Sequence, residues 1–261
     1  MPMESNIRAI GRGLKVLQAV NHHRSLSMME IARNCELPYP TTCRIVETLI
    51  EERMIEREAT RKHYRPTALV KTLSVGYQAD DALALAARRH ICALTRELRW
   101  PISVCTRVGM TMMIRESTHV IAPFTLNLYH PGYTMPLLDS SSGKVHLAFS
   151  DDDEREAVID LVRRASPAAD DRMATRLRTV LHEIRAKGYA IQDRIRHTAN
   201  PGKTSAISVP IMREGPCEAT VTLAFFASAM TIESAVTTFL PRIRTVAEAI
   251  ARELPQQRTA G

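Results

Sequence analysis

The chain has 261 residues, of which 45% are hydrophobic and 24% charged, so it has a globular composition and enough length for two domains. Its 35 Lys and Arg against 28 Asp and Glu give a formal net charge of +7, which favours polyanionic partners without identifying one. Five scattered cysteines without CxxC or zinc-type spacing indicate reduced thiols and no structural metal, and no apolar run is long enough for a signal core or a membrane span. We therefore expect a cytoplasmic protein with no cofactor and no membrane partner.

The first predicted element is a helix over residues 8–21. Its apolar side chains recur at helical spacing and share one face: Ile10, Leu14, Leu17 and Val20. Arg8 and Arg12 lie at its start, where a positively charged arm would reach DNA phosphates or the minor groove. Both positions are equally consistent with solvated arginines on a helix surface.

Residues 27–51 predict two short helices joined by a turn. Ser27 and Glu30 form a capping box that begins the first helix, which ends before Pro38 because proline disfavours helix in the preceding residue. The second helix begins at Pro40, with apolar side chains on one face and polar ones on the other. The polar face presents Thr41, Thr42, Arg44, Glu47 and Glu51. This pattern is typical of a helix-turn-helix, whose second helix enters the major groove of DNA.

A predicted two-stranded ribbon follows, over residues 54–57 and 63–65. The turn between its strands holds Arg61, Lys62 and His63, and such cations would meet phosphates, as the wing of a winged helix does. Any small helical domain has amphipathic helices and a basic turn. The order of capping box, turn, polar helix and basic ribbon nevertheless favours a winged helix-turn-helix.

The rest of the chain predicts a second, α+β domain. After a connecting helix over 67–78, the pattern predicts a helix over 82–99, a hairpin over 102–115, helices over 141–149, 152–164 and 171–187, strands over 205–212 and 219–226, and a last helix from Thr231 past Pro241. Antiparallel strands with helices alongside make an α+β fold. We assign residues 1–66 to the winged helix-turn-helix, 67–80 to a linker helix, 81–255 to an effector-binding and oligomerisation domain, and 256–261 to a tail.

The predicted helix at Ser141 offers a site for an anion. Amides at a helix N-terminus bind a carboxylate without catalysis, here with the hydroxyls of Ser141 and Ser142 and the positive end of the helix dipole. Arg115 and His119 are further candidates, because a guanidinium matches a carboxylate with two hydrogen bonds. Arg115 could equally face solvent, and His119 could be a plain loop residue.

An enzymatic alternative uses the same segment. Ser141 and Lys144 match S-x-x-K, and residues 203–205 approximate the K-T-G of penicillin-interacting serine enzymes, in which a lysine helps activate the serine. The Ser-Asp-Asn motif of those enzymes is missing between them, and hydroxyl caps of a helix are a simpler interpretation. A serine hydrolase using Ser141 and Lys144 stays as an alternative function.

Several segments resemble the IclR family of bacterial transcriptional regulators. They are IGRGLKVL at 10–17 and LSMMEIARNCELPYPTTCRIVETLIEERMIER at 26–57, then PLLDSSSGKVHLAF at 136–149, GYAIQD at 188–193, SAISVPI at 205–211 and ASAMTIE at 227–233. Within the family, RESTH at 115–119, SSGKVHLAF and ASAMTIE make the chain most similar to the activators of 3-(3-hydroxyphenyl)propionate catabolism. The resemblance covers nearly the whole chain.

The resemblance implies a sheet curved around a small-molecule pocket, similar to the GAF and PAS sensory folds. The implied pocket positions are Met135, Ser141, Ser142, Gln192, Thr222, Ala224 and either Ala206 or, with a shifted gap, Ser205. Gln192 stands where the family has an acidic residue, and Thr222 and Ala224 stand where it has serines. The loss of those serines makes the pocket more apolar, which suits an aromatic ring. Ordinary core packing would produce the same pattern of residues.

We predict a ligand-responsive transcriptional regulator that controls the catabolism of an aromatic acid, hydroxyphenylpropionate-like or lignin-derived. The residues expected to contact base edges are Tyr39, Thr41, Thr42, Cys43 and Arg44, and those expected to contact phosphates are Arg8, Arg12, Arg61 and Lys62. One winged helix makes too small an interface for a unique site, so we expect a homodimer or, as in the family, a homotetramer on a palindromic DNA operator, with RNA polymerase as a candidate partner. A DNA-binding module whose second domain only oligomerises is the other alternative.

Overall fold

The structure, a computed structural model, describes residues 7–75, 81–126, 129–165, 171–196, 200–213 and 215–254. The chain divides into two compact units, Met1–Ala79 and Asp80–Gly261, which we describe separately. The end of the expected linker, residues 76–80, and the expected tail, residues 256–261, lie outside the described residues.

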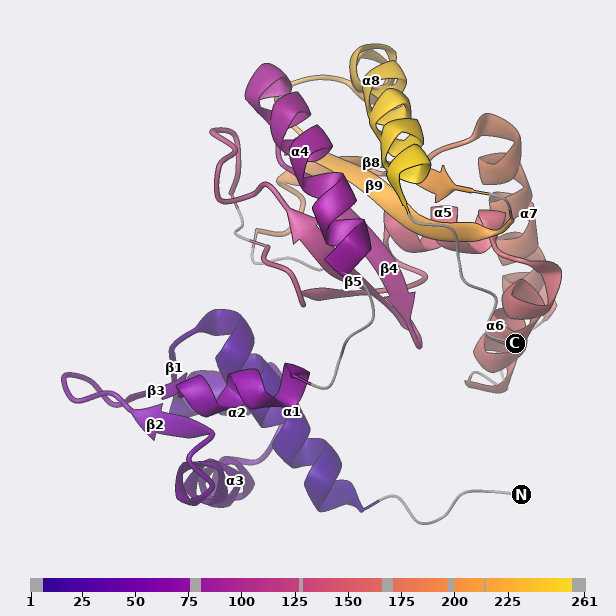
Figure 1. The fold of residues 1–261 in the computed structure, drawn as a ribbon. Coiled ribbons are helices and arrows are strands. Elements are labelled where there is room, and N and C mark those ends of the chain that lie inside the picture. Colours follow the sequence, from indigo (N-terminus) through magenta and orange to yellow (C-terminus); the bar gives the residue numbers. More distant parts are fainter. Residues whose placement is uncertain are drawn as a thin grey trace. The chain divides into compact units, whose positions relative to one another are not determined.

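The described part of the first unit combines helices with a small antiparallel sheet (Figure 1). The helices are α1 (Arg8–His23), α2 (Met28–Cys35) and α3 (Tyr39–Glu51), and the strands are β1 (Leu26–Ser27), β2 (Ile55–Arg57) and β3 (His63–Pro66). The strands follow the order β1-β3-β2, so the wing formed by β2 and β3 is extended by a strand that precedes α2. The predicted helix-turn-helix with a wing is therefore confirmed.

Local sequence explains the boundaries of α2 and α3. The capping box is present, because the Ser27 amide donates to Glu30 Oε2 (2.8 Å) and the Glu30 amide donates to Ser27 Oγ (3.4 Å). Glu36 adopts a left-handed conformation (φ 52°) and ends α2, and α3 begins at Tyr39, one residue before the predicted start. Strand β1 was not predicted, because two residues are too few to show an alternating pattern.

The segment after the wing is a 3-10 helix, η1 (Ala68–Ser74). Val70 packs against the core of the first unit, and the Thr67 hydroxyl donates to the Arg53 carbonyl. The described part of the expected linker therefore packs into the first unit and differs from a free α-helical connector.

The described part of the second unit is one antiparallel sheet with helices on both faces (Figure 1). The strands are β4 (Ile102–Val108), β5 (Thr111–Ser117), β6 (Thr134–Pro136), β7 (Ala190–Gln192), β8 (Thr204–Met212) and β9 (Cys217–Phe226), in the order β6-β5-β4-β9-β8-β7. The helices are α4 (Asp81–Leu98), α5 (Ser141–Phe149), α6 (Asp152–Ala165), α7 (Asp171–Lys187) and α8 (Ile232–Glu253). The predicted α+β class is confirmed.

Alternation along the strands gives this sheet two different faces. Val104 and Val221 point to the large core under α4 and α8, whereas Cys105, Met112 and Ile114 belong to the core under α5 and α7. Strands β6 and β7 have three residues each and were not predicted. No helix within the described ranges has the length and apolar content that crossing a membrane requires.

Candidate functional site

The N-terminal half of α3 carries the residues predicted to contact DNA bases. Tyr39 and Arg44 are exposed, and Thr41 and Cys43 are half-buried. The neighbouring Cys43 raises the pKa of the Tyr39 phenol, so Tyr39 presents a neutral hydroxyl at physiological pH. This surface offers hydrogen-bond donors and a guanidinium without an acidic side chain in the first turn of α3.

Thr42 was wrongly predicted as a base-contacting residue. Its side chain is fully buried, and its hydroxyl donates to the Pro38 carbonyl (3.1 Å). A threonine that returns its hydroxyl to the carbonyl four residues earlier has no donor left for a base edge. Thr42 supports the start of α3 instead.

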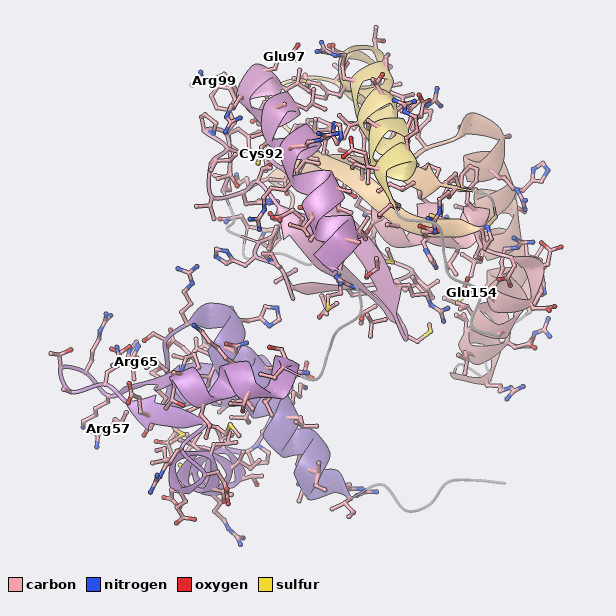
Figure 2. The ribbon with its side chains drawn as sticks, viewed as in Figure 1. Arg57, Arg65, Cys92, Glu97, Arg99 and Glu154 are labelled. Carbon is pink, nitrogen blue, oxygen red and sulfur yellow. The ribbon has the colours of Figure 1, made fainter. Side chains whose placement is uncertain are left out.

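The wing carries further exposed cations. Arg61 pairs with Glu58 (3.1 Å), while Ser25 Oγ donates to Glu58 (2.6 Å) and keeps the pKa of Glu58 below its usual range. Lys62 is exposed at the tip. Figure 2 shows Arg57 and Arg65 on the strands of the wing, where Arg65 pairs with Glu56 (2.7 Å). Arg57 is exposed and was not predicted, because strand alternation places it on the same face as the buried Ile55, two residues before it.

Arg8 and Arg12 are both exposed in the first turns of α1. Their positions agree with a contact to DNA and equally with a solvated helix surface. Their predicted role stays a prediction.

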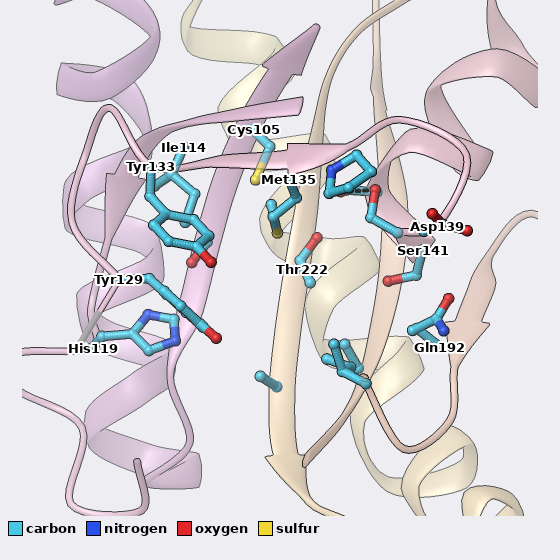
Figure 3. A pocket seen from close by; sticks show the side chains of 17 residues that line it. Cys105, Ile114, His119, Tyr129, Tyr133, Met135, Asp139, Ser141, Gln192 and Thr222 are labelled. Carbon is cyan, nitrogen blue, oxygen red and sulfur yellow. Dashed lines mark hydrogen bonds between the residues drawn. The ribbon is translucent and has the colours of Figure 1, made fainter. Parts of the chain in front are cut away.

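A cavity lies in the second unit, between the sheet and the N-terminus of α5 (Figure 3). It is lined by Ser103, Cys105, Ile114, His119, Tyr129, Tyr133, Met135, Pro136, Asp139, Ser140, Ser141, Ser142, Gln192, Ile195, Ala206, Thr222 and Ala224.

Hydroxyl groups form one end of this cavity. Ser141 Oγ lies 2.7 Å from Ser208 Oγ, which in turn lies 2.8 Å from Thr222 Oγ1. Ser140 caps α5 by accepting from the Gly143 amide (3.1 Å), as the hydroxyl caps in the sequence indicated. Because Ser141 is only 3% exposed, these hydroxyls serve the interior of the unit and not its surface.

Gly143 allows α5 to approach the chain that precedes it. A Cβ added at Gly143 would lie 1.9 Å from the Leu137 carbonyl oxygen, so only glycine fits there. This close approach holds the serines of α5 against the sheet. Packing therefore explains why this position of α5 holds a glycine.

Aromatic rings form the opposite end of the cavity. His119 packs edge-on against Tyr129 (5.1 Å between centroids), and Tyr129 packs against Tyr133 (4.5 Å). Burial lowers the pKa of His119 to about 4, with a smaller contribution from the charge of His130, so the imidazole is neutral at physiological pH. Ser117 Oγ lies 2.8 Å from Nδ1 and fixes the ring.

Two residues predicted for the pocket are not among the described lining residues. Arg115 lies where the β4–β5 register shifts, between Glu116, which faces α4, and Ile114, which faces the cavity. Ser205 alternates with Ala206 on β8 and donates to Asp193 (2.8 Å) on the other face. Of the two residues suggested for the family's cysteine position, Ala206 is the one that lines the cavity.

Several lining residues were missed from the sequence. Ser103 and Cys105 alternate with buried aliphatic residues in the predicted strand, so this alternation could have indicated them. Burial raises the pKa of Cys105 to about 12, so its thiol stays protonated. Tyr129 and Tyr133 come from an irregular segment, whose position no local pattern specifies.

The geometry gives the serine hydrolase no support. Lys144 Nζ donates to Gln192 (3.2 Å), whereas the Ser141 hydroxyl is bonded to Ser208, so no lysine is positioned to activate this serine. Among the described residues, no group of His, Cys, Asp or Glu side chains could hold a metal ion.

Comparison with known proteins shows the family. The IclR helix-turn-helix domain matches residues 9–59, and the bacterial transcriptional regulator IclR C-terminal domain matches residues 79–252. The probable transcriptional regulator SauR of Cupriavidus necator is 26% identical over 215 residues, 82% of this chain and 83% of SauR. The regulator TsaQ1/TsaQ2 of Comamonas testosteroni is 23% identical over 190 residues, 72% of this chain and 68% of the relative.

Solved structures share the fold at low sequence identity. A transcriptional regulator from Rhodococcus sp. RHA1 matches with a TM-score of 0.66 and 22% identity, over 95% of this chain and 98% of that one. An IclR homologue from Microbacterium hydrocarbonoxydans, solved with 4-hydroxybenzoate, matches with a TM-score of 0.63 and 21% identity, over 94% of this chain and 98% of that one. Because the family models together match more than half of its length, the chain belongs to the IclR family of bacterial transcriptional regulators, which bind DNA and are not enzymes.

Proposed function

We propose that this regulator responds to an aromatic carboxylic acid, hydroxyphenylpropionate-like or lignin-derived, and controls the genes for its breakdown. The observation that carries the proposal is the cavity with hydroxyls at one end and aromatic rings at the other. A ring would pack on Tyr129 and His119, while polar substituents would meet the serines of α5.

The N-terminus of α5 would hold the carboxylate of the acid. No described lining residue is a lysine or arginine, and Asp139 adds an acidic side chain, so the N-terminal amides of α5 and the helix dipole would supply the main stabilisation of an anion. Lys144 adds a cation one layer behind Gln192. The Microbacterium homologue with 4-hydroxybenzoate supports the chemical class, as a property of that protein.

On DNA, Arg44 would contact base edges, while Lys62, Arg8 and Arg12 would contact phosphates. A homodimer or homotetramer on a palindromic operator would double the small interface of one winged helix, and RNA polymerase is a candidate partner at the promoter. The effector would act by binding one arrangement of the DNA-binding units more tightly than another.

The test is fluorescence anisotropy with duplex DNA from upstream of the protein's own gene, compared with scrambled DNA at fixed salt. We expect selective binding that one acid from an aromatic panel changes. Selective binding that no acid changes would support a second unit that only oligomerises. Equal, weak binding to both duplexes would overturn the proposal that the protein recognises an operator in this DNA.

The serines give a second test of the same proposal. Ser141→Ala combined with Ser142→Ala removes hydroxyls at the polar end, so we expect effector affinity to fall by about tenfold, roughly one hydrogen bond to a charged group. DNA affinity without effector should not change. Calorimetry measures the first quantity and anisotropy the second, and unchanged effector affinity would exclude these hydroxyls from the site.

A further inference from the structure

A second hollow adjoins the cavity, where β8 begins and β9 ends. It is lined by Pro101, Phe124, Leu126, Thr204, Phe225 and Phe226, among others. The two hollows have lining residues in common, namely His119, Tyr129, Ile195 and Ala224. The two hollows are therefore adjacent and separated only by side chains that line both.

The register of β8 and β9 shows how the two hollows are connected. Three directly opposed pairs point to the face of the sheet that lines the cavity: Ser208 with Thr222, Ala206 with Ala224, and Thr204 with Phe226. Because side chains alternate, these pairs form a path along the sheet from hydroxyls, over two alanines, to an aromatic ring. The four steps along the strand from Ser208 to Thr204 span about 13 Å.

The two alanines leave the middle of this path open. Larger side chains at Ala206 and Ala224 would fill the space between the polar end and the second hollow. Beyond them, Trp100 packs against Phe226 (5.0 Å, edge-on) and Phe124 (5.0 Å), so the far end is a fixed aromatic wall.

The boundary between the hollows is a pair of aromatic rings. His119 is held by Ser117, while Tyr129 contacts both His119 and Tyr133. A flat ring placed over Ala224 would pack against this pair and extend into both hollows.

We infer that the two hollows form one binding site for an elongated aromatic acid, with its carboxylate at the serines of α5 and a second ring, or an equally long apolar chain, beside Phe226. This inference rests on the proposed function and narrows its ligand class. A single-ring acid bound at the serines is shorter than the path and leaves the second hollow to water. A longer acid also buries the apolar surface there, so it binds more tightly.

The experiment compares 4-hydroxybenzoate, with one ring, and 4-phenoxybenzoate, with two, by calorimetry on the full-length protein. We expect the two-ring acid to bind about tenfold more tightly. Thr204→Leu fills the second hollow from its floor, so it should remove this tenfold advantage and leave 4-hydroxybenzoate affinity unchanged. Ser141→Ala is the matched control at the polar end, and it should weaken both acids equally.

Leu126→Ala provides an independent variant, because Leu126 is 48% exposed and its truncation should not disturb folding. It should weaken only the two-ring acid, by several-fold. The inference would be overturned if the unaltered protein bound the two acids equally tightly, or if Thr204→Leu and Leu126→Ala weakened both acids to the same extent. Binding of 4-hydroxybenzoate would still support the proposed function in that case. Failure of both acids to bind would overturn the proposed function as well.

Discussion

The two units place their functional side chains in opposite surroundings. In the first unit, Arg44 and Lys62 project from the surface. In the second, Ser141 and His119 are 3% and 4% exposed and already hydrogen-bonded within the chain. Surface substitutions usually cost little stability, whereas buried ones disturb packing and polar partners together. Substitutions of functional residues should therefore change DNA binding without changing stability in the first unit, and change ligand binding and stability together in the second.

A pair of glycines gives the strongest test of this contrast. Gly143→Ala forces a Cβ against the Leu137 backbone, so we expect the second unit to lose about 3 kcal/mol of unfolding free energy or more. Gly11→Ala in α1 meets no atom within 4 Å and should be neutral or stabilise the first unit by up to about 1 kcal/mol. Urea unfolding followed by circular dichroism measures both, and equal stability of the two variants would remove the contrast.

On the surface of the first unit, function should change without stability. Arg44→Ala should lose about 1–3 kcal/mol of discrimination between operator and random DNA, because a base contact is removed. Lys62→Ala should weaken both complexes alike and lower the slope of affinity against salt by about 1. Anisotropy titrations at several salt concentrations separate these effects. Equal losses on both sequences for Arg44→Ala would count against its contact with bases.

In the interior of the second unit, the titration of His119 should make the stability of the protein depend on pH. In the folded protein the pKa of His119 is about 4, so the imidazole stays neutral down to that pH, whereas in the unfolded chain it takes up a proton near its ordinary pKa of 6.5. The stabilisation is therefore complete above pH 6.5 and is lost as the pH falls toward 4, by about 2 kcal/mol at pH 5.

The variant His119→Asn tests this assignment, because asparagine does not titrate. Its unfolding free energy should change less between pH 7.5 and pH 5 than that of the unaltered protein, whatever constant cost the substitution adds. Parallel pH profiles would show that His119 is not held neutral by burial.

The same contrast explains what the sequence could predict. The capping box at Ser27 and the polar face of α3 depend on residues a few positions apart, so local rules identified them. The cavity depends on β4, β5, α5, β8 and β9 meeting in space, and Arg115 was misplaced because a register shift is decided by strand pairing. Ser205 and Ala206 could not be distinguished without knowing which face of β8 meets α5.

Thr42 sharpens the comparison on the smallest scale, because it is a buried residue inside the exposed DNA-binding surface. Thr42→Val keeps the shape of the side chain and loses the hydrogen bond to the Pro38 carbonyl, which still accepts from the Thr42 amide (3.0 Å), so we expect a cost of about 1 kcal/mol or less. Discrimination between operator and random DNA should stay unchanged. Thr41→Val, at a half-exposed neighbour, should instead keep stability and weaken operator binding. If Thr42→Val reduced discrimination between operator and random DNA without changing stability, burial would not distinguish the residues of α3 that support the fold from those that contact DNA.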